Sequence, residues 1–96
     1  MAINHMKLTT VENIVNEISL FVQTEIIDQS FSFDNTLSFK DLGIDSMAKI
    51  QIILFVERKY GIKIETEDLI PKNLESISTL AVFTFNRLEN GEKKYG

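Results

Sequence analysis

The strongest constraint on the fold is an apolar segment from Ala48 to Tyr60 that contains neither proline nor glycine. Its apolar side chains recur at spacings of three and four residues, which predicts a helix. Asp45 or Ser46 can cap the start of this helix, and Gly61 is a typical residue just after a helix end. We therefore expect a helix over about Ser46 to Tyr60, with a serine hydroxyl at its start.

The start of this helix is a suitable place for an anion. The first turn of a helix has unpaired N–H groups and the positive end of the helix dipole. A phosphate esterified to Ser46 would therefore be stabilised by backbone donors. Asp and Ser are also common simple caps, so the pair Asp45-Ser46 does not by itself indicate an attachment site. The surrounding sequence is needed to choose between the two interpretations.

The sequence LGIDSM over residues 42–47 is followed by the apolar segment, which closes on ERKYGI over residues 57–62. This arrangement resembles the acyl and peptidyl carrier protein family, whose attachment motif is similar to LGxDSL. The resemblance extends from about Val11 to Leu88. Met47 stands where leucine is usual, and this exchange conserves volume.

The resemblance implies a stand-alone carrier rather than an enzyme. A separate phosphopantetheinyl transferase would attach 4′-phosphopantetheine from coenzyme A to Ser46, with Asp45 as the flanking motif residue. The thiol of this arm would hold acyl or aminoacyl groups as thioesters. A loading ligase or adenylating enzyme would supply the cargo, and a downstream acyl-processing enzyme would consume it.

An amphipathic segment precedes the motif. Its apolar residues form one stripe at helical spacing, and Thr9 or Thr10 offers a cap, so we expect a helix over about Thr10 to Thr24. The segment from Glu25 to Asp45 has irregular spacing but too many apolar groups to leave in water. We expect this long loop to be held against the helices, because each buried Phe or Ile contributes roughly 1.5–3 kcal/mol. The apolar residues concerned are Ile26, Ile27, Phe31, Phe33, Leu37, Phe39, Leu42 and Ile44.

Within this loop, Asp34-Asn35 predicts a turn, and Gly43 suggests a close approach or a positive φ. After Gly61, the run Glu67 to Ile70 predicts a short third helix that stops at Pro71.

Ser76 is a good cap for a last apolar stripe, which predicts a helix over about Ile77 to Leu88. Together with the resemblance, these elements predict an all-α, four-helix bundle of acyl-carrier type. It has a long loop between helices one and two and a short third helix. Residues 9–88 form the carrier domain, between a flexible N-terminal segment (1–8) and a flexible C-terminal tail (89–96).

The helix over residues 46–60 is more apolar than one buried face requires. One stripe faces the core and a second lies on the side of Ser46, because residues three, four and seven apart share a helix face. A fully buried helix would also explain the second stripe, but carriers of the resembled family present this face to their enzymes. The inward residues are Ile52, Ile53, Val56 and Tyr60, and the predicted partner-binding residues are Met47, Ile50 and Leu54.

The charges on this helix bear on the pathway. Lys49, Arg58 and Lys59 outnumber Glu57, whereas fatty-acid-synthase carriers usually have acids on this face. We therefore expect a specialised pathway of the secondary-metabolite, polyketide or nonribosomal peptide type. Two alternatives stay open: a carrier of primary fatty-acid synthesis, and an unmodified helical module that binds partners while Ser46 serves only as a cap.

Several other functions have no support in the sequence. The net charge of −4 disfavours nucleic acid as a partner. No cysteine is present and His5 is the sole histidine, so we expect no metal site and no serine-hydrolase triad. The chain has no apolar run of the roughly 18 residues needed for a membrane span, and its start does not resemble a signal peptide. We expect a monomeric, cytoplasmic protein.

Overall fold

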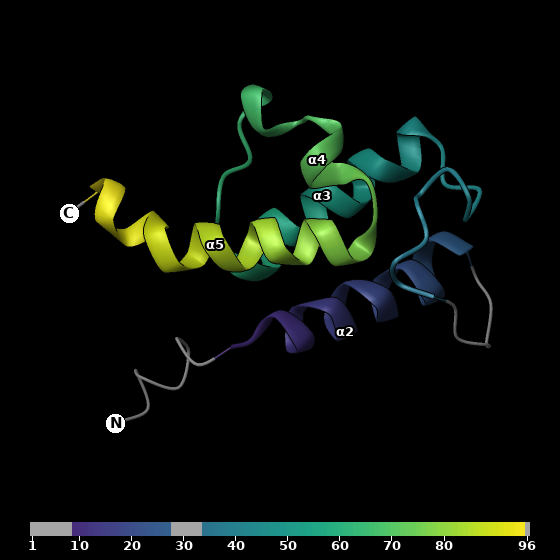
Figure 1. The fold of residues 1–96 in the computed structure, drawn as a ribbon, viewed down its shortest axis with the longest axis horizontal. Coiled ribbons are helices and arrows are strands. Elements are labelled where there is room, and N and C mark those ends of the chain that lie inside the picture. Colours follow the sequence, from purple (N-terminus) through teal and green to yellow (C-terminus); the bar gives the residue numbers. More distant parts are fainter. Residues whose placement is uncertain (1–8, 28–33, 96) are drawn as a thin grey trace.

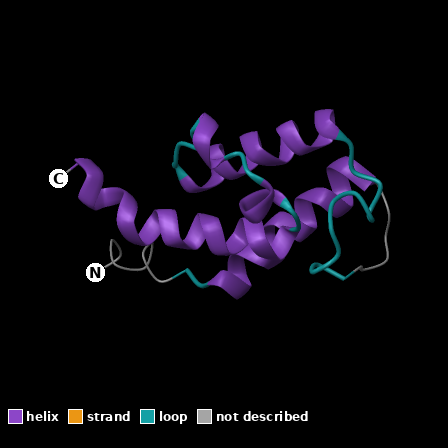
Figure 2. Cartoon of the chain, turned by 45° about the horizontal axis from the view of Figure 1, so that its top comes forward, coloured by secondary structure: helices purple, strands orange, loops and turns teal. Residues whose placement is uncertain are grey.

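The computed structural model describes residues 9–27 and 34–95, and these are mostly helical (Figure 2). Within these ranges no strand is present, although an isolated antiparallel bridge joins Ser38 and Ser76. This confirms the predicted all-α fold with a short third helix. The elements are α2 (Val11–Phe21), the π-helix η1 (Val22–Ile27), α3 (Ser46–Tyr60), the 3-10 helix η2 (Thr66–Asp68), α4 (Pro71–Leu74) and α5 (Ile77–Tyr95).

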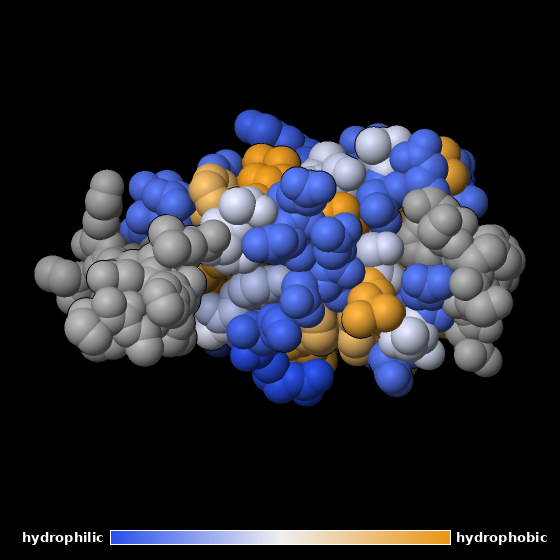
Figure 3. Space-filling view, turned by 90° about the horizontal axis from the view of Figure 1, so that it is seen from below, coloured by the Kyte–Doolittle hydropathy of each residue, from blue (hydrophilic) through white to orange (hydrophobic). Residues whose placement is uncertain are grey.

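The longest helix, α5, crosses the middle of the molecule (Figure 1). Helix α2 packs against α5 and runs in the opposite direction, while α4 packs against the first part of α5. Helix α3 contacts α2 as well. The side on which α2 lies is mainly hydrophilic, with separate apolar patches (Figure 3). In the part of the chain that the structure describes, no helix combines the length and the hydrophobicity needed to cross a membrane.

The core lies where these helices meet. It is mainly aliphatic, and the buried threonine Thr84 donates its hydroxyl to the carbonyl of Leu80 at 2.8 Å. The internal hydrogen bond removes most of the cost of burying that hydroxyl. Completely buried side chains come from α2, η1, α3 and α5: Ile14, Ile18, Val22, Ile52, Val56, Ile77, Leu80, Ala81 and Thr84.

Side-chain caps start the three long helices, as the sequence predicts. The Thr10 hydroxyl accepts the Asn13 N–H at 3.1 Å, and the Ser76 hydroxyl accepts the Thr79 N–H at 3.1 Å. Of the two candidate caps for α3, Asp45 is the one used. Gly61 ends α3 with φ of 65°, a left-handed conformation that glycine adopts without strain.

The first helix begins where it was expected, but its later part has a different winding. The α-helix ends at Phe21, and a π-helix continues from Val22 to Ile27. Ile26 and Ile27, which we expected in the long loop, are therefore helical, and both pack against the core. Near the change of winding, the Thr24 hydroxyl donates to the Leu20 carbonyl at 2.8 Å.

The predicted end of the third helix at Pro71 is wrong. Pro71 is the first residue of α4, a position that suits its fixed φ and its missing N–H. The short helix before it is η2, in which Glu65 and Asp68 form a capping box.

The predicted end of the last helix is also wrong, because the backbone of α5 is helical beyond Leu88 to Tyr95. The flexibility of the tail stays a prediction, and the N-terminal segment 1–8 lies outside the described residues.

The loop before α3 is held against the start of α5. The Phe39 N–H donates to the Glu75 carbonyl at 2.7 Å, and the Ser78 N–H donates to the Asn35 carbonyl at 3.1 Å. The Phe39 side chain is 2% exposed, which confirms that apolar burial holds the loop. Leu37 is instead 39% exposed, and Phe31 and Phe33 lie outside the described residues.

The predicted turn at Asp34-Asn35 is present. The Asp34 carboxylate accepts the Thr36 hydroxyl at 2.6 Å and the Thr36 N–H at 2.8 Å. These two bonds, the hydroxyl first, lower the pKa of the Asp34 carboxyl below its usual value.

Candidate functional site

Ser46 is the first residue of α3, and its side chain is exposed. The Asp45 carboxylate accepts the Ala48 N–H at 2.9 Å, and the Asp45 backbone carbonyl accepts the Lys49 N–H at 3.0 Å. Because Asp45 caps the helix, the Ser46 hydroxyl is not needed for this purpose. It is therefore available at the surface in the first turn of a helix.

The segment before Ser46 has a fixed path. Gly43 has φ of 78°, and a Cβ built at this position would meet nothing within 4 Å. The glycine is thus required by its backbone conformation and not by a lack of space. The next residue, Ile44, is 5% exposed and donates its N–H to the Phe39 carbonyl at 2.9 Å. These contacts fix the start of α3 relative to the core.

Ser46 lies in an open depression that two lysines also line, Lys40 from the loop and Lys49 from α3. A phosphate bonded to the Ser46 hydroxyl would lie near these two cations and near the first-turn N–H groups that Asp45 does not already bind. The donor set therefore fits a phosphodiester. Helical spacing accounts for Lys49, but sequence reasoning missed Lys40 because no local pattern fixes the path of an irregular loop. The remaining residues of the depression are Gly43, Ile44 and Asp45.

The two predicted stripes of α3 are separated in the structure. Met47, Ile50 and Leu54 are 71%, 53% and 47% exposed, so the alternative of a fully buried helix is wrong. Ile52 and Val56 are completely buried. Contact of the exposed stripe with partners stays a prediction. Of the other residues predicted to face inward, Ile53 and Tyr60 are partly buried against the core.

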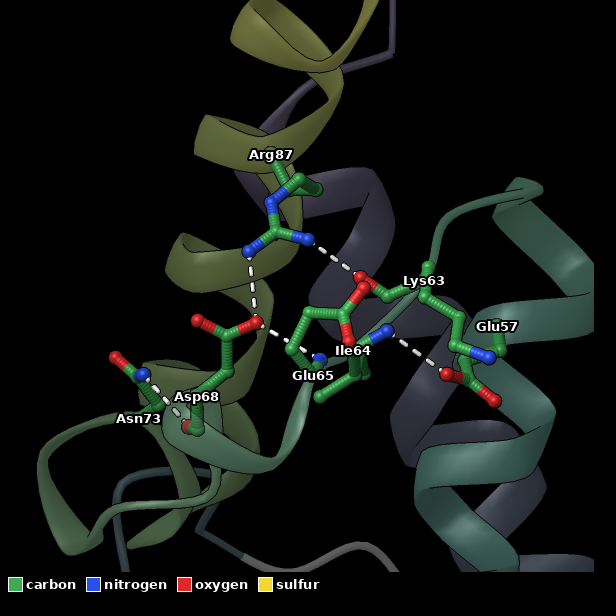
Figure 4. Close-up of polar contacts among 7 residues, drawn as sticks. All are labelled: Glu57, Lys63, Ile64, Glu65, Asp68, Asn73 and Arg87. Carbon is green, nitrogen blue, oxygen red and sulfur yellow. Dashed lines mark hydrogen bonds and ion pairs between the residues drawn. The ribbon is translucent and has the colours of Figure 1, made fainter. Parts of the chain in front are cut away.

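Glu57, the acidic residue of α3, forms a hydrogen bond within the molecule. The Glu57 carboxylate accepts the Ile64 N–H at 2.8 Å and so connects α3 to the segment that follows it (Figure 4). The cation Lys59 pairs with Glu17 of α2 at 3.3 Å. Arg58 is exposed beside Leu54, where both residues line a shallow hollow against the end of α2. The stripe of Met47, Ile50 and Leu54 is therefore apolar, and the cation Arg58 lies at its far end in a hollow that Glu25 also lines.

Comparison with known proteins shows a similarity to carrier proteins. The family model described as the phosphopantetheine attachment site matches residues 23–83, a range that includes Ser46. An anthracycline acyl carrier protein of Streptomyces sp. (strain C5) is 32% identical over 80 residues, covering 75% of this chain and 93% of that protein. Another, from Streptomyces peucetius, has the same identity and coverage. An acyl carrier protein of Arthrobacter sp. (strain FB24) is 32% identical over 87 residues, covering 90% of this chain and 96% of that protein.

The chain therefore belongs to the acyl carrier protein family, whose members bear a covalent 4′-phosphopantetheine. It is a carrier protein that holds its cargo on this arm. Membership implies that a phosphopantetheinyl transferase and acyl-processing enzymes act on it.

Proposed function

We propose that Ser46 Oγ bears the 4′-phosphopantetheine arm and that the chain carries acyl or aminoacyl groups as thioesters on it. The observation that supports this most directly is the exposure of Ser46 in the first turn of α3, with Asp45 already acting as the cap. Lys40 and Lys49 line the same depression and would favour a bound phosphate.

The chain itself has no catalytic role in this proposal. When attached, the arm supplies a thiol that forms and exchanges thioesters. The chain holds Ser46 at a fixed helix start, through the Asp45 cap and the buried Ile44, so that a transferase can reach the hydroxyl. Partner enzymes load and consume the cargo.

Mass spectrometry tests the attachment site. Incubation of the apo protein with a broad-specificity phosphopantetheinyl transferase and coenzyme A should add one arm, and peptide mapping should place it on Ser46. Ser46→Ala should add none, while the control Ser78→Ala should react as the unchanged protein does. Circular dichroism checks that each variant is folded. Addition elsewhere, or no addition to the unchanged protein, would favour the unmodified interaction module and contradict the proposal.

We propose that the pathway is a specialised one. Two of the relatives are named as anthracycline carriers, and the exposed face of α3 lacks the acids usual in fatty-acid carriers. A carrier of primary fatty-acid synthesis is the second candidate, because another relative is named simply as an acyl carrier protein. Enzymes with basic docking patches should be poorly attracted to Lys49 and Arg58.

Loading of the holo protein distinguishes the two pathways. We expect a dedicated ligase or adenylating enzyme to load it at a rate that depends little on salt, since apolar contacts would dominate. Fatty-acid enzymes should load it weakly. Efficient loading by fatty-acid enzymes that falls steeply with salt, or recovery of long-chain thioesters from the host, would support primary fatty-acid synthesis instead.

We propose that partner enzymes bind the exposed stripe formed by Met47, Ile50 and Leu54. The exposure of these three large apolar side chains supports the proposal, because exposed apolar patches are typical of interaction surfaces. We also propose that the chain acts as a monomer in the cytoplasm.

A further inference from the structure

A second hollow lies next to the depression around Ser46. Lys40 and Lys49 line both of them, so the two hollows meet at these lysines. The second hollow, here called the α4 groove, is formed by the loop before α3, by α3 itself and by the segment around α4. Its other lining residues are Ser38, Phe39, Leu69, Ile70, Pro71, Leu74 and Glu75.

The α4 groove has an apolar wall that is open to water. Leu69 and Ile70 are 44% and 42% exposed, although both are large aliphatic residues. The backbone holds them in place, because the Leu69 N–H donates to the Thr66 carbonyl at 3.1 Å and the Ile70 N–H donates to the Asp68 carbonyl at 2.9 Å. A group with apolar parts that lay along this wall would remove these side chains from water.

The charge at the junction of the hollows is positive. Lys49 follows Ser46 by three residues and therefore lies on the same side of α3. Lys40 enters from the loop. The acids on these walls are Asp45, whose carboxylate already accepts the Ala48 N–H, and Glu75 in the α4 groove. An anion attached to Ser46 would therefore lie beside two cations that come from separate elements.

We propose that Lys40 and Lys49 bind the phosphodiester of the arm and direct the arm into the α4 groove. The proposal rests on attachment at Ser46, as argued above. A phosphodiester bonded to Ser46 Oγ starts at the depression that Ser46, Lys40 and Lys49 line. Hydrogen bonds between ammonium groups and phosphate are strong among protein hydrogen bonds, and two cations together limit the directions in which the arm can leave. Lys40 and Lys49 act here as positioning residues.

Amide NMR spectra of the apo and holo forms test this positioning. Mass spectrometry first establishes that each sample carries one arm on Ser46. In the unchanged protein, conversion from apo to holo should then shift the amide signals of Leu69, Ile70 and Leu74. The double variant Lys40→Gln, Lys49→Gln should lose these shifts while still accepting the arm. Lys49→Arg should keep them.

The matched control is Lys63→Gln, Lys72→Gln, which removes the same charge from lysines that line neither hollow. It should behave as the unchanged protein does. In addition, the phosphorus NMR signal of the holo form should move with added salt in the control and should lose that salt dependence in the Lys40→Gln, Lys49→Gln variant.

The possible failures are distinguishable. Shifts confined to residues next to Ser46, or shifts that survive in the double variant, would overturn the role of the two lysines and leave attachment at Ser46 intact. Absence of any mass increase would instead overturn attachment itself before the spectra are compared.

Discussion

The guanidinium of Arg87 on α5 donates to the carboxylate of Asp68 in η2 at 2.8 Å, and each side chain is less than one-fifth exposed, at 16% and 17% (Figure 4). The guanidinium also donates to the Lys63 carbonyl and lies 5.1 Å from the centre of the Phe83 ring. Asp68 in turn accepts the Glu65 N–H at 2.9 Å. One cation thus connects the segment between α3 and α4 to the last helix.

Removal of this cation should loosen that segment. We expect Arg87→Gln to lower the free energy of unfolding by about 1–3 kcal/mol, because Asp68 would lose a charged partner in a poorly hydrated place. Hydrogen exchange at the Glu65 amide should become faster. The control is Lys59→Gln, which breaks an ion pair with Glu17 whose side chains are both nearly half exposed, and it should cost less than about 1 kcal/mol. Equal effects of the two changes would contradict the assigned role of Arg87.

The cap of α3 can be separated from the attachment serine. Asp45→Ala removes the acceptor of the Ala48 N–H and should cost about 0.5–2 kcal/mol in urea unfolding. Ser46→Ala should change stability by no more than about 0.5 kcal/mol, since it is a surface change to a good helix former. A larger loss for Ser46→Ala than for Asp45→Ala would show that the serine is structural.

The two stripes of α3 should respond differently to substitution. Ile52→Ala removes a completely buried side chain and should cost about 2–5 kcal/mol. Ile50→Glu alters a side chain that is 53% exposed and should leave thermal unfolding nearly unchanged. It should nevertheless slow loading by the cognate enzyme, measured as thioester formed per minute. If Ile50→Glu unfolds the protein, the outward assignment of this stripe is wrong.

Tyr60 should make stability fall at high pH. Burial, with a smaller contribution from the charge of Glu17, raises the pKa of Tyr60 from 10.0 to about 12. Between pH 10 and 12 the folded state keeps the Tyr60 proton that the unfolded state loses. The contribution of Tyr60 to the free energy of unfolding is therefore complete below pH 10 and is lost as the pH rises toward 12. The measurement is the free energy of unfolding as a function of pH.

Tyr60→Phe is the control and should remove this part of the pH dependence. The Tyr60 hydroxyl is buried, and among the described residues it has no hydrogen-bond partner. Its removal should therefore be neutral or stabilise the protein by up to about 1 kcal/mol. An unchanged fall in stability between pH 10 and 12 would assign the effect to another group.

The bounds of α3 were predictable because the signals for them are local. Asp45 and Gly61 mark its start and end, and the apolar residues between them recur with the helical period. Pro71 was misread because proline both ends a helix and begins one, and α4 is too short for its spacing to decide. The end of α5 was missed because the two glycines and the charges of both signs after Leu88 suggested a tail, whereas one glycine within a helix costs only about 1 kcal/mol.

The surroundings of Ser46 were only partly predictable. One helix and its cap contain Asp45, Ser46 and Lys49, so the helical period gives the relative positions of these residues. Lys40 reaches the site because the neighbouring Phe39 bonds to Glu75, a residue far along the chain. No local pattern encodes such a pairing, and the α4 groove could not be predicted for the same reason.

The bridge between Ser38 and Ser76 also has a consequence for the order of folding. Its two residues are separated by the whole of α3, η2 and α4, so it closes a long loop, and the entropic cost of closure grows with loop length. Single helices form from local contacts within about a microsecond, but this bridge has to wait for the start of α5. We expect the segment that leads to Ser46 to reach its final position late. During synthesis on the ribosome, the segment that leads to Ser46 would then reach its final position only after Ser76 has emerged.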